Sequence, residues 1–174
     1  MTLTIRDAVP ADAAAILPIH NHAVRNTTAV WNEAESDLAG REAWLAARAL
    51  AGFPVLVAEI GGALAGYASF GEFRAWEGYR FTVEHSIYVD PARHRAGIGR
   101  ALLEALVERA RAMGKHAMIA GIEAGNAGSI ALHAALGFRE VGRLPQVGSK
   151  FGRWLDLVFL QLTLDDRPAP WFRP

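Results

Sequence analysis

Hydrophobic positions along the chain follow two spacings, one typical of strands and one typical of helices. Apolar residues that alternate or cluster over short runs predict strands, as over Leu3–Ala8 and Thr82–Val89. Apolar residues three and four positions apart predict amphipathic helices. The clearest helical stripe consists of Ile98, Leu102, Leu106, Ala110 and Met113, and Gly114 ends that helix.

The remaining pattern completes an alternation of strands and helices. It predicts strands over 54–60, 63–70, 116–122, 138–144 and 154–164, and helices over 10–25, 36–52 and 129–136. Gly61-Gly62 predicts a tight hairpin, Pro18 predicts a bend near Leu17, and Pro145–Arg153 is expected to be a connection. This order predicts an α/β or α+β sheet domain over 1–165 with helices on its faces, and a loose tail over 166–174.

A basic loop with two glycines joins the strand ending at Val89 to the helix starting near Ile98. Backbone N–H groups at a helix N-terminus lack intrahelical partners, so they attract and bind phosphate. Gly97 and Gly99 let an anion approach the backbone, and Arg93 and other arginines add charge. The loop therefore indicates a pyrophosphate site, although two spaced glycines alone are equally typical of an ordinary connection.

Alternation along the strand before this loop places Glu84, Ser86 and Tyr88 on one face, and His85 on the other face. If the second face is the core, Glu84 points into the cleft that the glycine loop borders. A carboxylate there suits a general base. A solvated or paired glutamate is the alternative that the residue alone leaves open.

Composition narrows the function classes. The 174 residues carry 18 basic and 18 acidic side chains, so the overall charge gives no reason to expect nucleic acid or an anionic membrane as partner. The chain has no cysteine, which excludes disulfides, thiolate metal sites and a cysteine nucleophile. No apolar run is long enough to span a bilayer, and the N-terminus has no secretory pattern, so a cytoplasmic protein is expected.

The six histidines do not form a recognisable metal motif. His20 and His22 are two positions apart without a carboxylate partner, and no His-Glu-x-x-His spacing occurs, so no metal is expected. His133 lies on the short helix after Asn126, where it is a candidate for proton exchange or simply a core-edge side chain.

Together these stretches resemble the GNAT superfamily of N-acetyltransferases. The motifs are His94-Arg-Ala-Gly-Ile-Gly-Arg, the stretch from Asn126 to Leu-Gly-Phe138, and the N-terminal Ile-Arg-Asp-Ala strand. Three further stretches resemble the phosphinothricin and methionine sulfoximine/sulfone branch: Asn26-Thr-Thr-Ala, Thr82 to Val89, and Lys150-Phe-Gly-Arg-Trp-Leu-Asp. His94, where Gln or Arg is usual, and Pro18 depart from the family pattern.

The resemblance implies a mixed, mostly antiparallel twisted sheet flanked by helices, and acetyl-CoA as cosubstrate. The implied cofactor-binding residues are Ile87, Tyr88, Val89, Arg95, Ala96, Gly97, Ile98, Gly99, Arg100, Asn126 and Ser129. Glu84 matches the base of this branch, and His133 falls where most of the superfamily carries a tyrosine that protonates the departing thiolate. A homodimer is expected from the family.

The acceptor expected from this branch is a small amino acid analogue whose free α-amine attacks the thioester of acetyl-CoA directly. Arg74, Trp76, Glu84, His85 and Ser86 are the expected acceptor-binding residues. Lys150 and Arg153 are further basic candidates for binding a carboxylate, and Phe73 and Phe151 for walling the pocket. The alternatives are another amine (a polyamine, an aminoglycoside or a protein N-terminus) and a non-catalytic acyl-CoA sensor.

Overall fold

The computed structural model describes residues 2–93 and 96–170. The strands are β1 (Leu3–Asp7), β2 (Val55–Ile60), β3 (Ala63–Glu72), β4 (Thr82–Val89), β5 (Ala117–Glu123), β6 (Arg139–Lys150) and β7 (Arg153–Thr163). The helices are α1 (Ala13–Asn26), α2 (Leu38–Leu50), α3 (Ile98–Ala112) and α4 (Ala127–Ala135). Short 3-10 turns cover Pro10–Asp12, Glu77–Tyr79 and Pro91–Arg93.

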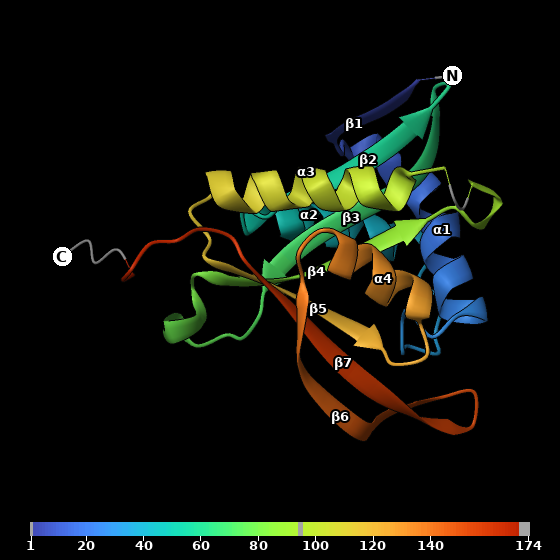
Figure 1. Ribbon diagram of the computed structural model, residues 1–174. Coiled ribbons are helices and arrows are strands. Elements are labelled where there is room, and N and C mark those ends of the chain that lie inside the picture. Colours follow the sequence, from blue (N-terminus) through green and yellow to red (C-terminus); the bar gives the residue numbers. More distant parts are fainter. Residues whose placement is uncertain (1, 94–95, 171–174) are drawn as a thin grey trace.

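All the described strands form one sheet in the order β1-β2-β3-β4-β5-β7-β6. Each neighbouring pair is antiparallel except β4 and β5, which run parallel. Helices cover both faces, with α3 and α4 in front of the sheet and α1 and α2 behind it in Figure 1. This is the mixed, mostly antiparallel sheet flanked by helices that the sequence predicts.

The hydrophobic core is divided by the sheet. On one face, α3 packs its apolar stripe, including Leu102 and Leu106, against β2 to β5 and β7. On the other face, Ile16 and Ile19 of α1 and Leu45 of α2 pack on Val57 and neighbouring strand residues. Because helices cover both faces, the central strands β2 and β3 are buried along nearly continuous runs.

Most predicted element boundaries hold within two or three residues. Asp37 caps α2 by accepting a hydrogen bond from the Gly40 N–H at 2.8 Å. Gly61 and Gly62 have positive φ, as a two-residue hairpin turn requires. Pro18 lies inside α1, which continues through it as one helix from Ala13 to Asn26.

The prediction that Pro145–Arg153 is a connection is wrong. β6 continues to Lys150 and joins β7 by a turn at Phe151 and Gly152, both with positive φ. Pro145 is tolerated because β6 is an edge strand and the register shifts between Leu144 and Gly148. At that irregularity the Gln146 N–H donates to the side-chain carboxylate of Asp156 on β7, at 2.8 Å.

Within the described part of the chain, no helix has the length and apolarity needed to cross a membrane. The start of the tail is held by Arg167, which donates hydrogen bonds to the carbonyls of Gly114 and Lys115 at 2.8 and 3.1 Å. Residues 171–174, the end of the tail predicted to be loose, lie outside the described residues.

Candidate active site

The parallel strands β4 and β5 separate partway along their length. β5 pairs with β4 only over Thr82–Glu84, opposite Ala117–Ile119, in the described chain. On its other side β4 stays paired with β3 as far as Val89. The second half of β4 therefore borders a gap in the sheet, and α3 and α4 begin at the two edges of that gap, because each follows one of the diverging strands.

Two backbone N–H groups of β4 face this gap. Asp90 donates its N–H to Ala65 of β3, and the direction of hydrogen bonding alternates along an antiparallel strand. The N–H groups of Ile87 and Val89 therefore point away from β3, toward the side on which β5 has separated. A ligand placed in the gap can accept hydrogen bonds from them.

A cavity of about 1070 Å³ occupies the gap and the space beside it. Its walls come from α1 and the segment after it, from β4, from the N-terminus of α3, and from the β5–α4 connection with α4. The lining residues central to the site are Ile87, Tyr88, Val89, Gly97, Ile98, Gly99, Arg100, Asn126, Ser129 and His133. A volume of this size is at the upper end for small-molecule and cofactor pockets.

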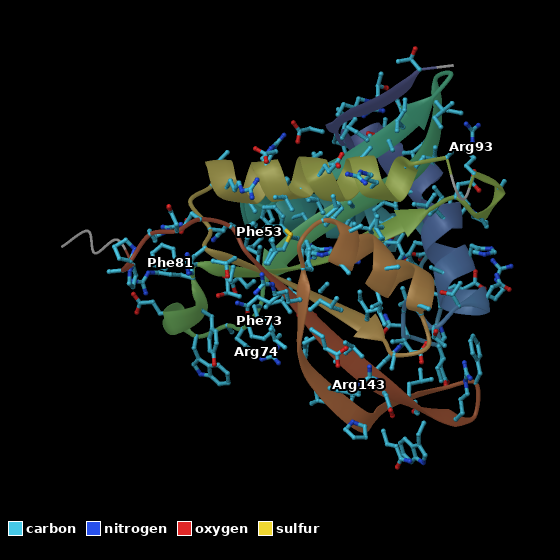
Figure 2. All side chains as sticks on the ribbon, in the orientation of Figure 1. Phe53, Phe73, Arg74, Phe81, Arg93 and Arg143 are labelled. Carbon is cyan, nitrogen blue, oxygen red and sulfur yellow. The ribbon has the colours of Figure 1, made fainter. Side chains whose placement is uncertain are left out.

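The N-terminus of α3 forms an open cradle at one end of the cavity. Gly97 is the N-cap residue with a φ of 77°, a conformation that favours glycine. A Cβ at Gly99 would lie 3.3 Å from Leu132 of α4, so glycine keeps the wall close and the backbone accessible. Arg93, labelled in Figure 2, and Arg100 line the same part of the cavity. Free N–H groups, the helix dipole and two guanidinium groups make this end suitable for phosphate.

Glu84 is the last residue of β4 that pairs with β5. Its carboxylate leans over Gly121 of β5, where a Cβ would lie 2.9 Å from the Glu84 Oε1. Partial burial raises the pKa of the Glu84 carboxyl, and the positive charge of Arg74 opposes this shift. Glu84 is therefore a half-buried carboxylate at the point where the gap opens, with a pKa moved toward neutral pH, as a general base requires.

His133 lies at the cavity wall, almost entirely buried. Its Nδ1 is hydrogen-bonded to the Ser129 carbonyl at 2.7 Å, and its Nε2 lies 3.3 Å from the Nε2 of His85. Burial lowers the pKa of His133, and the hydrogen bond to Ser129 opposes this shift. Both ring nitrogens of His133 therefore have partners within the protein.

The comparisons agree with this geometry. The model of the Acetyltransferase (GNAT) family matches residues 16–138. The L-methionine sulfoximine/L-methionine sulfone acetyltransferase of Salmonella typhimurium is 56% identical over 168 residues, covering 97% of this chain and 98% of that protein. The chain belongs to the GNAT family of acetyltransferases.

Two further relatives extend the comparison. The phosphinothricin N-acetyltransferase of Alcaligenes faecalis is 41% identical over 163 residues, covering 93% of this chain and 83% of that protein. An acetyltransferase structure from Salmonella typhimurium with its cofactor acetyl-CoA has a TM-score of 0.94 and 56% identity, and the match covers 97% of both chains. The fold is thus that of a GNAT enzyme over nearly the whole chain.

The structure gathers most of the residues that the GNAT motifs predict to bind the cofactor. All of them line the cavity except Ala96 and Arg95. Ala96 is outside the lining, and Arg95, like His94, is outside the residues that the structure describes. Asn126 uses its Oδ1 to cap α4, accepting a hydrogen bond from the Ser129 N–H at 3.1 Å. Its side chain therefore fixes the start of α4 as well as lining the cavity.

Lys150 does not bind an acceptor carboxylate as the sequence suggested. It is only 1% exposed, and its Nζ donates hydrogen bonds to the carbonyls of Val24 at 2.5 Å, Thr27 at 2.7 Å and Val30. These carbonyls belong to the end of α1 and the segment after it. Lys150 therefore ties that part of the cavity wall to β6, and no local pattern around Lys150 indicates these distant partners.

The other predicted acceptor residues lie in the β3–β4 loop and on the two faces of β4. Arg74 stacks on Phe73, 4.3 Å from the ring centre, in the β3–β4 loop, where both are labelled in Figure 2. Ser86 shares the face of Glu84, whereas His85 is buried on the opposite face against His133 and Phe138. His85 is therefore placed to support His133 and not to contact an acceptor beside Glu84. Trp76 is 71% exposed and packs on Tyr79.

Sequence reasoning missed a polar contact in the cavity wall. Thr28 donates its hydroxyl to the Glu123 carboxylate at 3.0 Å, and the other carboxylate oxygen accepts the Gly125 N–H at 2.9 Å. Both Thr28 and Glu123 line the cavity. The motif Asn26-Thr-Thr-Ala marked one partner, but nothing local marked Glu123. Among the residues with described positions, no cluster of three or more candidate ligands could hold a metal ion.

Proposed function

We propose that this enzyme transfers the acetyl group of acetyl-CoA to the α-amine of a small amino acid analogue of the methionine sulfoximine, methionine sulfone or phosphinothricin type. The observation that carries the proposal is the half-buried Glu84 where β4 and β5 separate, on the same strand as Ile87 to Val89, which line a cavity that ends at the glycine cradle of α3. The names of the relatives support the acceptor class.

The cavity suits acetyl-CoA in three respects. The outward N–H groups of Ile87 and Val89 provide partners for the amide carbonyls of pantetheine. The N-terminus of α3 offers free N–H groups at Gly97 to Gly99 for the pyrophosphate, and a Cβ at Gly99 would narrow the space toward Leu132. Arg93 and Arg100 supply compensating positive charge.

For the chemistry, we assign Glu84 as the general base. It takes a proton from the acceptor amine, directly or through one water, so that the nitrogen lone pair attacks the thioester carbonyl. The carbonyl oxygen then gains negative charge, which a β4 backbone N–H in the gap stabilises. Holding amine and thioester together in the gap contributes a further several kcal/mol to lowering the barrier.

An acceptor with an α-carboxylate fits the charges beside Glu84. Arg74 is near enough to Glu84 to affect its pKa, so a carboxylate bound by Arg74 would place the α-amine near the base. Arg153 and Phe151 line the neighbouring cavity. A polyamine or an aminoglycoside would meet the positive charge of Arg74 unfavourably, and a non-catalytic sensor would not need a carboxylate with a raised pKa.

We also propose a homodimer formed through β6 and β7, with the enzyme located in the cytoplasm. β6 is an edge strand, and exposed apolar side chains gather on the hairpin: Val141, Leu144, Val147, Phe151 and Trp154. Exposed apolar residues along an open edge are typical of an interface. Sedimentation of the wild type and of Trp154→Arg tests this, because a monomeric wild type would contradict it.

The acceptor assignment is tested by following thiol release from acetyl-CoA. The panel contains methionine sulfoximine, methionine sulfone, phosphinothricin, a polyamine and an aminoglycoside, each with the wild type and with Glu84→Gln. We expect turnover with the amino acid analogues and a loss of about 100-fold or more in Glu84→Gln. Turnover with the polyamine alone, or an undiminished Glu84→Gln, would contradict the proposal.

A further inference from the structure

His85 and His133 form a buried pair on the face of β4 opposite Glu84. The side chains are 9% and 4% exposed, their ring planes lie within 10° of each other, and their Nε2 atoms are 3.3 Å apart. Phe138 packs edge-on against both rings, with centroid distances of 5.7 and 5.2 Å. The pair therefore lies in an apolar environment that favours neutral imidazoles.

The hydrogen bonds of the pair determine where its protons lie. A carbonyl oxygen only accepts, so the Nδ1 of His133, 2.7 Å from the Ser129 carbonyl, carries a proton. A neutral imidazole has one N–H, so the Nε2 of His133 is an acceptor and the Nε2 of His85 donates to it. Each N–H of the pair then has a partner.

The remaining nitrogen fits the same assignment. The Nδ1 of His85 is buried without a hydrogen-bond partner among the described residues. In this assignment it is a bare acceptor, which is less costly to bury than an unpaired N–H. Burial lowers the pKa of His85 to about 3, with the neighbouring His133 contributing, which agrees with a neutral pair.

We propose that His85 is a positioning residue that, together with the Ser129 carbonyl, holds His133 as the neutral Nδ1–H tautomer, and that the fixed His133 shapes the cavity wall without protonating the departing thiolate. The second part rests on the proposed function. The proton balance closes without His133. The protonated acceptor amine gives one proton to Glu84 before the attack, and its nitrogen loses a second proton as the amide forms. The thiolate takes one of these protons, from Glu84 or through solvent water, and solvent takes the other.

The tautomers are tested by nitrogen-15 NMR of histidine-labelled protein at neutral pH. We expect His133 to be protonated at Nδ1 and His85 at Nε2. His85→Gln keeps an N–H near the Nε2 position and should preserve the His133 signal, whereas His85→Leu should give a mixture of tautomers. A His133 protonated at Nε2, or at both nitrogens, in the wild type would overturn the assignment. This readout does not depend on acetyl transfer.

The role in turnover is tested with His133→Asn, which keeps an N–H for the Ser129 carbonyl but cannot exchange a proton. We expect its kcat to stay within about tenfold of the wild type, because the Asn amide N–H replaces the His133 Nδ1–H as donor to the Ser129 carbonyl and both hydrogen bonds are neutral. A loss of 100-fold or more, as expected when a general acid is removed, would overturn the proposal. In His133→Asn the Nε2–H of His85 loses its acceptor, and the double variant His85→Leu/His133→Asn removes that donor as well. If His133→Asn does not fold, kcat is measured for the double variant, with the same tenfold and 100-fold limits.

Discussion

The Glu84 carboxylate lies directly over the α-carbon of Gly121 on the neighbouring strand. A Cβ at Gly121 would come within 2.9 Å of Glu84 Oε1, closer than such contacts occur without displacement. The missing side chain at position 121 therefore sets the position of the proposed base at the start of the strand gap.

Gly121→Ala is expected to displace the Glu84 carboxylate. Because a shift of about 1 Å in a reacting group can cost up to 100-fold, we expect kcat/KM for the acceptor to fall by about 10- to 100-fold. Binding of acetyl-CoA should change little, since Gly121 does not line the cavity. Gly142→Ala on β6, where a Cβ meets nothing within 4 Å, is the control, and equal losses in both variants would contradict the interpretation.

Arg74 is expected to set the acid limb of the pH profile. Its positive charge lowers the pKa of Glu84, against the larger raising effect of burial. Catalysis needs the carboxylate form, so Arg74→Ala should raise that pKa and move the acid limb of kcat/KM to higher pH. Arg143→Ala, on β6, should leave the limb in place (Figure 2). A shift toward lower pH in Arg74→Ala would refute this electrostatic account.

Glu84→Gln is expected to stabilise the fold while it removes activity. The folded-state pKa of Glu84 is raised by burial, so its contribution to stability is largest at low pH and is lost as pH rises through that pKa. Thermal unfolding should therefore show a higher midpoint for Glu84→Gln above that pKa, with the difference shrinking as the pH falls. A wild type that is more stable than the variant above that pKa would contradict the sign.

Lys150→Met is expected to destabilise the protein by about 3 kcal/mol, because it leaves buried carbonyls without a charged donor. The KM for acetyl-CoA should also rise, since Thr27 lies in the cavity wall that Lys150 holds. Denaturant unfolding measures the first effect. Lys115→Met removes one hydrogen bond, to the Arg80 carbonyl, and should cost about 1 kcal/mol.

Sequence patterns anticipated what depends on near neighbours. The alternation in β4 places Glu84 and His85 on opposite faces, and the glycine loop predicts the start of α3 at Ile98. Contacts between distant segments could not be predicted this way. The sequence marked Lys150 as a candidate for binding an acceptor carboxylate, whereas the fold brings it to carbonyls more than 100 residues away.

Dependence on contacts between distant segments also explains the other features of the structure that the sequence did not predict. The separation of β4 from β5 depends on how two strands pair, which no single segment encodes. The path of β6 through Pro145 depends on its place at the sheet edge, where a missing N–H and a register shift are tolerated. The pairing of His85 with His133 likewise joins residues 48 positions apart.

We propose that acetyl-CoA binds in the β4–β5 gap with its pyrophosphate at the N-terminus of α3. Titration calorimetry of purified protein with acetyl-CoA tests it most directly, with Gly99→Val narrowing the cradle and Gly142→Ala as control. We expect one site per chain, an affinity at least about tenfold weaker in Gly99→Val, and no change in Gly142→Ala. No heat of binding in the wild type, or equal affinities in wild type and Gly99→Val, would contradict the claim.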